Sequence, residues 1–427
     1  MRNSKKLFEA AGQESRWSRQ EAAALSEAGE STRHRAGKTS LLAAILVCAA
    51  SACSHAGTRE SLSLVGSLTP QFQPIWSPAG ERILQYSQMA WSDNGDQLIA
   101  SVMQGPRVAV LDVNHHRGQL MAVGDRGGEL VVAWIPGINQ WVTEALDPAA
   151  DGASPKRAWY VASDATHAMA LGQGRLRPPT VAARGIALSD GRPGFVAIEE
   201  AGMRGEAPPL VVRDLTGAEL SRVTPFPSDG ALRHVVEADF QQHSGRTLMV
   251  AAVDTVTRAG GRDPSGKWIE PVSEHDVEVA DAFSGKSFCK LTFKDELRDG
   301  RRQSFSFQGV ALSSDVRKFV VNTPKGALLY DVDTCRQLFA LRDERDAEGA
   351  SGKWIAFSGD GNFVIRDGAD VRSRHGGSID VWRVADGEHV IHEETESHAA
   401  LAVKAHSTEF AAGRDDGQID FFRIDIH

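Results

Sequence analysis

The sequence predicts an all-β fold, a seven-bladed β-propeller in which an N-terminal strand completes the last blade. Three observations support it. A short phrase recurs seven times, the segments between are brief apolar runs bounded by turn formers, and a spare strand precedes the first copy. With 41 Gly and 17 Pro among 427 residues, turns are frequent. No stretch after residue 56 keeps an apolar helical stripe over three turns, so strands are expected throughout.

Each copy of the phrase has a small apolar lead-in, an anchor residue, a Ser/Asp/Gly turn and a short hydrophobic run, as in MAWSDNGDQLIAS at residues 89–101. A closing strand follows, which in the first copy is Arg107–Val113. Successive anchors lie 43, 54, 52, 72, 45 and 46 residues apart. A four-stranded propeller blade takes about 40–45 residues, so each copy is predicted to form one blade. The anchors are Trp91, Trp134, Leu188, Phe240, Leu312, Phe357 and Val403.

The 72-residue gap requires an insertion, which we place in residues 254–271, a segment rich in Gly, Pro and charge. Long loops are expected around residues 144–156, 254–276 and 344–352, and propellers commonly bind partners through such loops. Within the insertion, Trp268 lies in SGKWI, a phrase that recurs around Trp354. Trp354 is expected in the core. Trp268, Lys267 and Arg262 are the candidate partner-binding residues.

The two ends of the repeat region fit each other. The chain ends three residues after Ile424, where the third strand of the last blade should end. Residues Ser61–Leu68 alternate in polarity like a strand and belong to no copy of the phrase. Placed on the outside of the last blade, this strand closes the ring by backbone hydrogen bonding, which removes an exposed sheet edge.

The first 53 residues read as a targeting segment. Arg33, Arg35 and Lys38 precede an apolar and small-residue run from Leu41 to Cys53. A basic flank, a short apolar stretch and small residues before a cleavage site are the parts of a secretory signal. The run has 13 residues, fewer than the roughly 20 needed to span a bilayer as a helix. We therefore expect an N-terminal extension and signal at 1–52, a tether at 53–60 and the propeller at 61–427.

Two resemblances follow from these residues. Ala50-Ser51-Ala52-Cys53 resembles the bacterial lipobox, which implies lipidation of Cys53, and Ser54 resembles the outer-membrane sorting pattern. Ala50 stands where that family prefers Leu, so cleavage without a lipid is the alternative. The resemblance implies a lipid-anchored protein of the bacterial cell envelope, on the outer membrane and facing the periplasm.

The repeated phrase resembles that of WD40 propellers over roughly residues 60–427. The closing Trp-Asp pair of that family appears here as Leu-Asp, Arg-Asp, Ala-Asp, Tyr-Asp, Trp-Arg and Phe-Arg. Ser397-His398 is the nearest approach to its Gly-His pair. A quinoprotein-like propeller is therefore an alternative to a strict WD40 assignment.

Two cysteines, Cys289 and Cys335, lie in the propeller region. In an oxidising periplasm they could pair, or they could be two free, buried thiols. No spacing argument brings them together, so both alternatives stay open.

Linear motifs for chemistry fail at specific positions. GKTS at 37–40 resembles a phosphate loop, but Thr32 stands where a Gly is needed. In HEETESH at 392–398 the second His follows the first by six residues, whereas two histidines that bind zinc from one helix face are four residues apart. His389 and His392 are expected on opposite faces of an outer strand, at a solvated charged edge. We assign no catalytic, cofactor-binding or metal-binding residue.

The net charge is −9, with no basic tract, which argues against nucleic acid as a partner. The expected function is a non-catalytic scaffold for protein–protein interaction that binds other envelope proteins or peptides and reaches the membrane through its lipid anchor. The alternative is a propeller enzyme, a lactonase, hydrolase or quinoprotein-like protein with a metal or cofactor at the central channel.

Overall fold

The structure is a computed structural model, and the described residues all lie in one compact unit, Thr58–His427. They are strands and turns, with no helix among them. The described ranges are 60–68, 86–102, 107–115, 117–123, 131–147, 156–163, 168–175, 180–199, 207–227, 229, 231–258, 261–262, 264, 268–269, 272–294, 296–298, 301–303, 307–342, 351–369, 376–414 and 416–427.

These residues form seven four-stranded antiparallel sheets, which are the blades. Blade 1 has β2 (Tyr86–Trp91), β3 (Gln97–Val102), β4 (Arg107–Asp112) and β5 (Arg117–Ala122); blade 2 has β6 (Val132–Ile135), β7 (Gln140–Asp147), β8 (Lys156–Ala162) and β9 (Met169–Arg175). Blade 3 has β10 (Thr180–Ala187), β11 (Pro193–Glu199), β12 (Leu210–Asp214) and β13 (Glu219–Val223); blade 4 has β14 (Leu232–His243), β15 (Arg246–Arg258), β18 (Val272–Asp281) and β19 (Ser287–Phe293).

Blade 5 has β22 (Gly309–Leu312), β23 (Lys318–Thr323), β24 (Gly326–Asp331) and β25 (Gln337–Leu341); blade 6 has β26 (Ser351–Phe357), β27 (Phe363–Ala369), β28 (Gly376–Arg383) and β29 (His389–Glu396). Blade 7 has β30 (His398–Val403), β31 (Glu409–Arg414), β32 (Ile419–Ile426) and, on its outer side, β1 (Glu60–Leu68). Two accessory pairs stand apart from the blades: β16 (Gly261–Arg262) with β17 (Trp268–Ile269), and β20 (Glu296–Arg298) with β21 (Arg301–Gln303).

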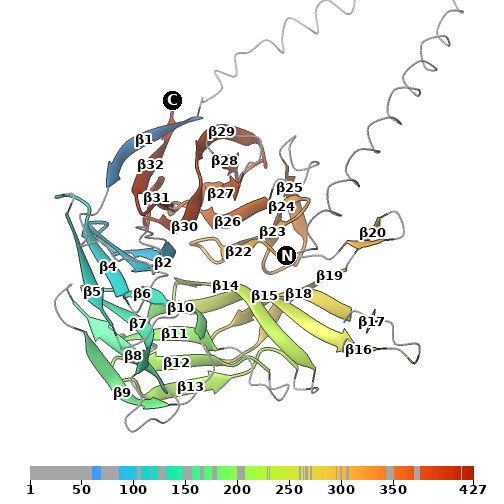
Figure 1. Ribbon diagram of the computed structural model, residues 1–427, viewed down its shortest axis with the longest axis horizontal. Coiled ribbons are helices and arrows are strands. Elements are labelled where there is room, and N and C mark those ends of the chain that lie inside the picture. The colour runs from blue at the N-terminus through green and yellow to red at the C-terminus, as the bar shows by residue number, and fades with distance from the viewer. Residues whose placement is uncertain are drawn as a thin grey trace, which may run out of the picture. The chain divides into compact units, whose positions relative to one another are not determined.

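The seven innermost strands surround a common centre (Figure 1). They contact one another in the order β2, β6, β10, β14, β22, β26 and β30, and β30 contacts β2. One cluster of buried apolar residues lies at each of the seven blade junctions in this part of the chain. The blades are therefore held by side-chain packing between sheet faces, as the predicted repeat requires.

Burial explains why inner and outer strands differ in sequence. The inner strand of each blade faces both neighbouring blades, and in β6 and β22 all four residues are apolar or glycine and buried. The outermost strands β5 and β13 are mostly exposed and polar. Two anchors add a hydrogen bond across a junction: Trp91 Nε1 donates to the Ala402 carbonyl at 3.2 Å, and Trp134 Nε1 donates to the Ala90 carbonyl at 2.9 Å.

The recurring Ser turn after the anchor has a common construction. In blade 1 the Ser92 hydroxyl accepts a hydrogen bond from the Gln97 N–H at 3.0 Å and donates to Asn94 at 2.7 Å. Ser313 and Ser358 make the corresponding pairs of bonds in blades 5 and 6. Local side-chain to backbone bonds of this kind fix tight turns. The motif can be recognised in the sequence because each turn needs the same residue types.

The N-terminal strand closes the ring as predicted. β1 pairs with β32 in antiparallel register from Glu60 opposite Ile426 to Leu68 opposite Ile419, with one irregularity between Leu64 and Gly66. At its start, Glu60 accepts hydrogen bonds from Arg383 of blade 6 at 2.6 and 3.0 Å. The first strand thus joins the last blade by its backbone and the preceding blade by an ion pair.

The predicted closing strand of the first copy, Arg107–Val113, matches β4 to within one residue. The predicted long loops were too wide. Residues 144–147 belong to β7, residues 272–276 to β18, and residues 351–352 to β26. Trp354 is half-buried in β26, so its predicted place in the core was wrong. Gly, Pro and charge mark an insertion well, but they do not show how far the flanking strands extend beyond the ring.

Deleting residues 58–68 should destabilise the whole ring, because β32 then loses its outer partner and exposes its edge. With each backbone hydrogen bond contributing about 1 kcal/mol, we expect the midpoint of thermal unfolding to fall by about 5–10 °C. Differential scanning calorimetry and analytical ultracentrifugation measure the midpoint and any edge-driven self-association. Ser61→Ala, which removes only an exposed hydrogen bond to His427, is the control. An unchanged midpoint in the deletion would contradict a closing role for β1.

Candidate functional site

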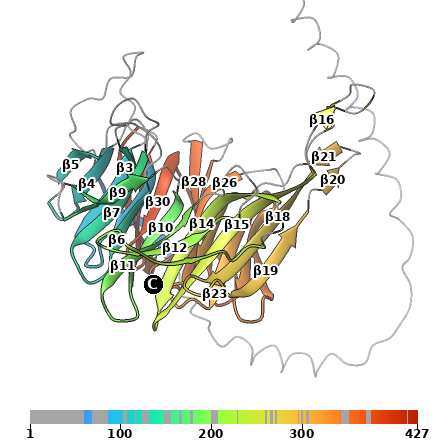
Figure 2. The same cartoon turned by 90° about the horizontal axis from the view of Figure 1, so that it is seen from below.

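Blade 4 carries the residues predicted to bind a partner. The insertion forms the β16–β17 pair, in which Arg262 lies directly opposite Trp268. The pairing brings the backbone positions of two of the three candidates together. Lys267 lies outside the described residues, as does Cys53, the predicted lipidation site. Figures 1 and 2 show the accessory pairs on the outer side of blade 4, beyond the strands of the ring.

The strands beneath these pairs are the longest of the ring. β14, β15 and β18 have 12, 13 and 10 residues, and β15 pairs with both others along most of its length. Two polar contacts lie near the ends of these strands. Arg233 Nη1 forms an ion pair with Asp229 Oδ1 at 2.7 Å, and His275 Nδ1 is hydrogen-bonded to Asp254 Oδ1 at 2.7 Å. Blade 4 is therefore a continuous β base for the β16–β17 pair.

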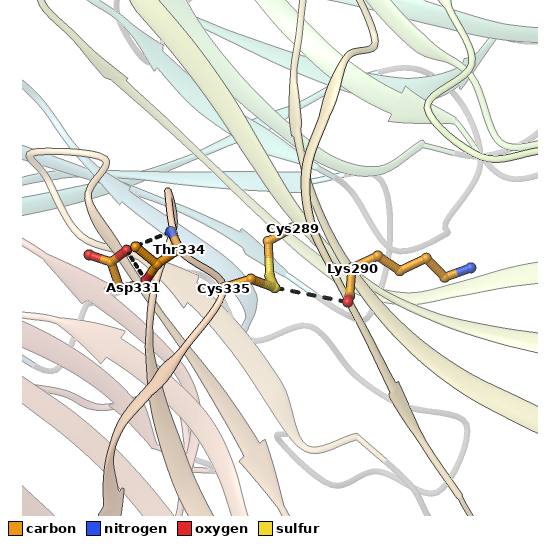
Figure 3. The surroundings of a disulfide bond; sticks show 5 residues. All are labelled: Cys289, Lys290, Asp331, Thr334 and Cys335. Atoms are coloured by element: carbon orange, nitrogen blue, oxygen red, sulfur yellow. Dashed lines mark hydrogen bonds between the residues drawn. A yellow bond between two sulfur atoms is a disulfide. The ribbon is translucent and has the colours of Figure 1, made fainter.

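A disulfide joins blade 4 to blade 5. Cys289 lies on β19 and Cys335 in the turn between β24 and β25, and the two are bonded (Figure 3). Of the two alternatives left open by the sequence, pairing is the one observed. Beside the bond, Arg246 lies 4.2 Å from the centre of the Phe288 ring and 3.6 Å from Asp333 of blade 5. The outer edge of blade 4 is thus tied to its neighbour by a covalent bond and by an ion pair.

A buried histidine joins blades 6 and 7. The ring nitrogens of His398 lie 3.2 Å from Asp367 Oδ2 of β27 and 3.7 Å from Asp420 Oδ2 of β32. Burial alone would lower the pKa of His398, but the two carboxylates outweigh burial and raise the pKa to about 9. The ring is therefore a cation at neutral pH, and it holds carboxylates from two different blades together.

A second charged group lies on the neighbouring strands of blade 6. Asp380 accepts from His389 Nε2 at 3.1 Å and from His392 Nδ1 at 2.8 Å, and it lies 3.2 Å from Arg366. Burial would raise the pKa of Asp380, but the two histidines and the charge of Arg366 hold it below its usual range.

This arrangement corrects one prediction. His389 and His392 were expected on opposite faces of their strand, yet both reach the same carboxylate. The reason is a register shift: Trp382 pairs with His389 and Val381 pairs with Ile391, so Val390 is an extra residue. A bulge of this kind changes the alternation of faces by one position, and nothing in the sequence around His389 marks it.

A cavity of about 230 Å³ lies between the outer strands of blades 6 and 7. Its wall combines apolar side chains of blade 7 with carboxylates of β29, which are Leu62, Leu64, Phe422, Glu393, Glu394 and Glu396. At its inner end Arg414 Nε lies 2.6 Å from Asp420 Oδ2, the same carboxylate that faces His398. The cavity was missed at the sequence level, because its two walls come from opposite ends of the chain.

In the part of the chain that the structure describes, no three His, Cys, Asp or Glu side chains are arranged to hold a metal ion. Likewise, no helix among those residues is long and apolar enough to cross a membrane.

Comparisons with known proteins concern the fold. No family model matches the chain, and no curated protein matches it. Among solved structures, the chain is similar to the β-propeller domain of Cps50 (Swd1) from Myceliophteria thermophila, with a TM-score of 0.54. The fold is a seven-bladed β-propeller. The match covers 86% of this chain and 100% of the other at 14% sequence identity, so the propeller architecture is what the two share.

The disulfide should stabilise the propeller measurably. It closes a loop across a sequence separation of 46 residues, for which removal of both sulfurs is expected to cost about 2–4 kcal/mol. Urea unfolding of Cys289→Ser/Cys335→Ser against wild type measures this difference. A reductant should lower the stability of wild type and leave the double variant unchanged. Equal stability of wild type with and without reductant would contradict the bond.

His398 should give a pH-dependent stabilisation with a definite sign. The pKa of His398 rises on folding from about 6.5 to about 9. The stabilisation is therefore complete below pH 6.5 and is lost as the pH rises through 9. We expect the difference in unfolding free energy between wild type and His398→Gln to shrink over that window in urea titrations. A difference that is constant from pH 6 to pH 9.5 would contradict a charged ring between Asp367 and Asp420.

Proposed function

We propose that this propeller is a non-catalytic scaffold for protein–protein interaction, held by a lipid on Cys53 in a bacterial cell envelope. The observation that carries the scaffold proposal is the β16–β17 pair, which extends from blade 4 and sets Arg262 opposite Trp268. Trp and Arg are the residues most enriched at the energetic centres of protein interfaces. The partner is another envelope protein or a peptide.

The base of this surface supports the proposal. Binding residues are most effective when a rigid element holds them, because less conformational entropy is then lost on association. Here β16 starts three residues after β15 ends, and β18 starts three residues after β17 ends. The disulfide from Cys289 to Cys335 ties the outer edge of the same blade. A protruding pair on a fixed blade suits recognition of a partner better than it suits enclosure of a small substrate.

The envelope location has two supports. One is the resemblance of Ala50–Cys53 to a lipobox after a basic flank and an apolar run. The other is the disulfide, since disulfides persist in oxidising compartments and are rare in the cytosol. Together they favour the periplasmic side of the outer membrane for the propeller.

Affinity capture from envelope extract tests the scaffold proposal. With the full chain as bait, a partner should be recovered, and Trp268→Ala should reduce its recovery about tenfold or more, as loss of an interface centre does. Leu220→Ala is the matched control, because Leu220 is 47% exposed on β13 of blade 3. Equal recovery with Trp268→Ala and with Leu220→Ala would contradict a role for the insertion.

The same material tests the anchor and the non-catalytic assignment. Cys53→Ser should move the protein from the membrane fraction to the soluble fraction, and metal analysis of the mature protein should find no stoichiometric ion. Membrane association that is unchanged in Cys53→Ser would overturn the lipid anchor. A stoichiometric metal would favour the propeller enzyme instead.

A further inference from the structure

The cavity between blades 6 and 7 has a structural origin. Between the two blades, Phe422 and Ile424 of β32 pack with Ile379 and Ile391 of blade 6 in the buried cluster of this junction. Farther out, Leu62 of β1 packs only partly against that cluster, and Leu64 is 57% exposed. The two sheets therefore separate toward the outside, and an apolar wall is left facing β29.

The opposite wall is negatively charged. Glu393 and Glu394 line it from adjacent positions of β29, and Glu396 follows two residues later. The cation of the lining, Arg414, lies 2.6 Å from the buried carboxylate of Asp420 and also interacts with the charge of Glu396. With one cation among four carboxylates the lining is negatively charged, which favours a cationic group and disfavours an anion.

The size narrows the class of ligand. Sites for small molecules usually measure about 300–1,000 Å³, whereas this cavity measures about 230 Å³. That space suits one or two side chains. Lys and Arg place their apolar stems along apolar surface while their charged heads reach polar groups. Leu62 and Phe422 supply the first of these environments, and the β29 carboxylates supply the second.

We propose that this cavity docks a basic and apolar segment of a partner protein, with a Lys or Arg side chain set between the Leu62–Phe422 wall and the carboxylates of β29. The site deepens the scaffold function proposed above and rests on it, but it uses a different surface from the β16–β17 pair. Its walls are the ring-closing strand β1 and the outer strand of blade 6, so closure of the ring creates the site.

Fluorescence anisotropy with a labelled probe tests the site on the mature protein. The probe is a capped hexapeptide of alternating Leu and Lys, and the control peptide has Glu in place of Lys. Wild type should bind the Lys peptide saturably and the Glu peptide at least about tenfold more weakly. Glu393→Gln/Glu394→Gln should weaken the Lys peptide about tenfold, with less effect at high salt because the charges are screened.

Matched variants separate the cavity from the general charge of the protein. Asp190→Asn/Glu274→Gln removes two exposed negative charges from blades 3 and 4 and should leave binding unchanged. Leu64→Ala should weaken binding severalfold, whereas Leu220→Ala, at another exposed leucine, should not. Circular dichroism and the unfolding midpoint confirm that each variant is folded.

Three results would overturn the proposal. In the first, neither peptide binds saturably up to millimolar concentration. In the second, both charge variants weaken binding of the Lys peptide equally. In the third, wild type self-associates and Glu393→Gln/Glu394→Gln abolishes the self-association, which would make a second copy of the chain the occupant. The outcome is independent of the insertion, since Trp268→Ala should bind the peptide like wild type. If Trp268→Ala loses partner capture and wild type does not bind the Lys peptide, the scaffold function is supported and only this site is rejected.

Discussion

The pairing of β1 with β32 is the interaction on which the propeller depends, because among the described strands it is the one sheet pairing that joins distant parts of the chain. Within every other blade the strands are consecutive in sequence or separated only by an accessory pair, and each blade can in principle form locally. Blade 7 alone takes its outer strand from the opposite end of the propeller region. The junction between β30 and β2 is buried like the other six. The pairing of β1 with β32 adds a backbone restraint at this closure and covers the edge of the last blade.

The same pairing explains why polar interactions gather at the junction of blades 6 and 7. β1 is set by its pairing with β32, and its Glu60 end meets Arg383 of blade 6. At the same junction, the His398 cation lies between carboxylates of both blades. Such a group costs desolvation energy, so breaking it is more damaging than its net contribution suggests. It also fixes how the two blades meet, because the carboxylates come from β27 and β32. The cavity is the outer end of this polar junction.

Much of the fold could be predicted because its signals are local. The Ser92, Ser313 and Ser358 turns each bond within five residues, and such turns repeat with the blade. The spare strand was found by matching an unpaired segment to an incomplete blade. The bulge at Val390, the bond between Cys289 and Cys335 and the cavity could not be found in this way. Each depends on register or on the approach of different blades, and a single sequence carries no record of either. The insertion that carries Arg262 and Trp268 could be located because it lengthens the spacing between two anchors, and the binding role of these residues stays a prediction.

The distribution of these features separates what holds the ring from what can vary on it. The seven apolar junctions leave little freedom where an inner strand is buried on both faces, as β6 and β22 are. Variation is tolerated where strands run beyond the ring or where outer strands diverge. Blade 4 is the first case and the junction of blades 6 and 7 is the second. Each is stabilised at its base, one by a disulfide and the other by buried charge, so a surface there can keep its geometry while its exposed residues change. Two interaction surfaces on one ring would let the propeller bring two partners together, which is the physical meaning of a scaffold.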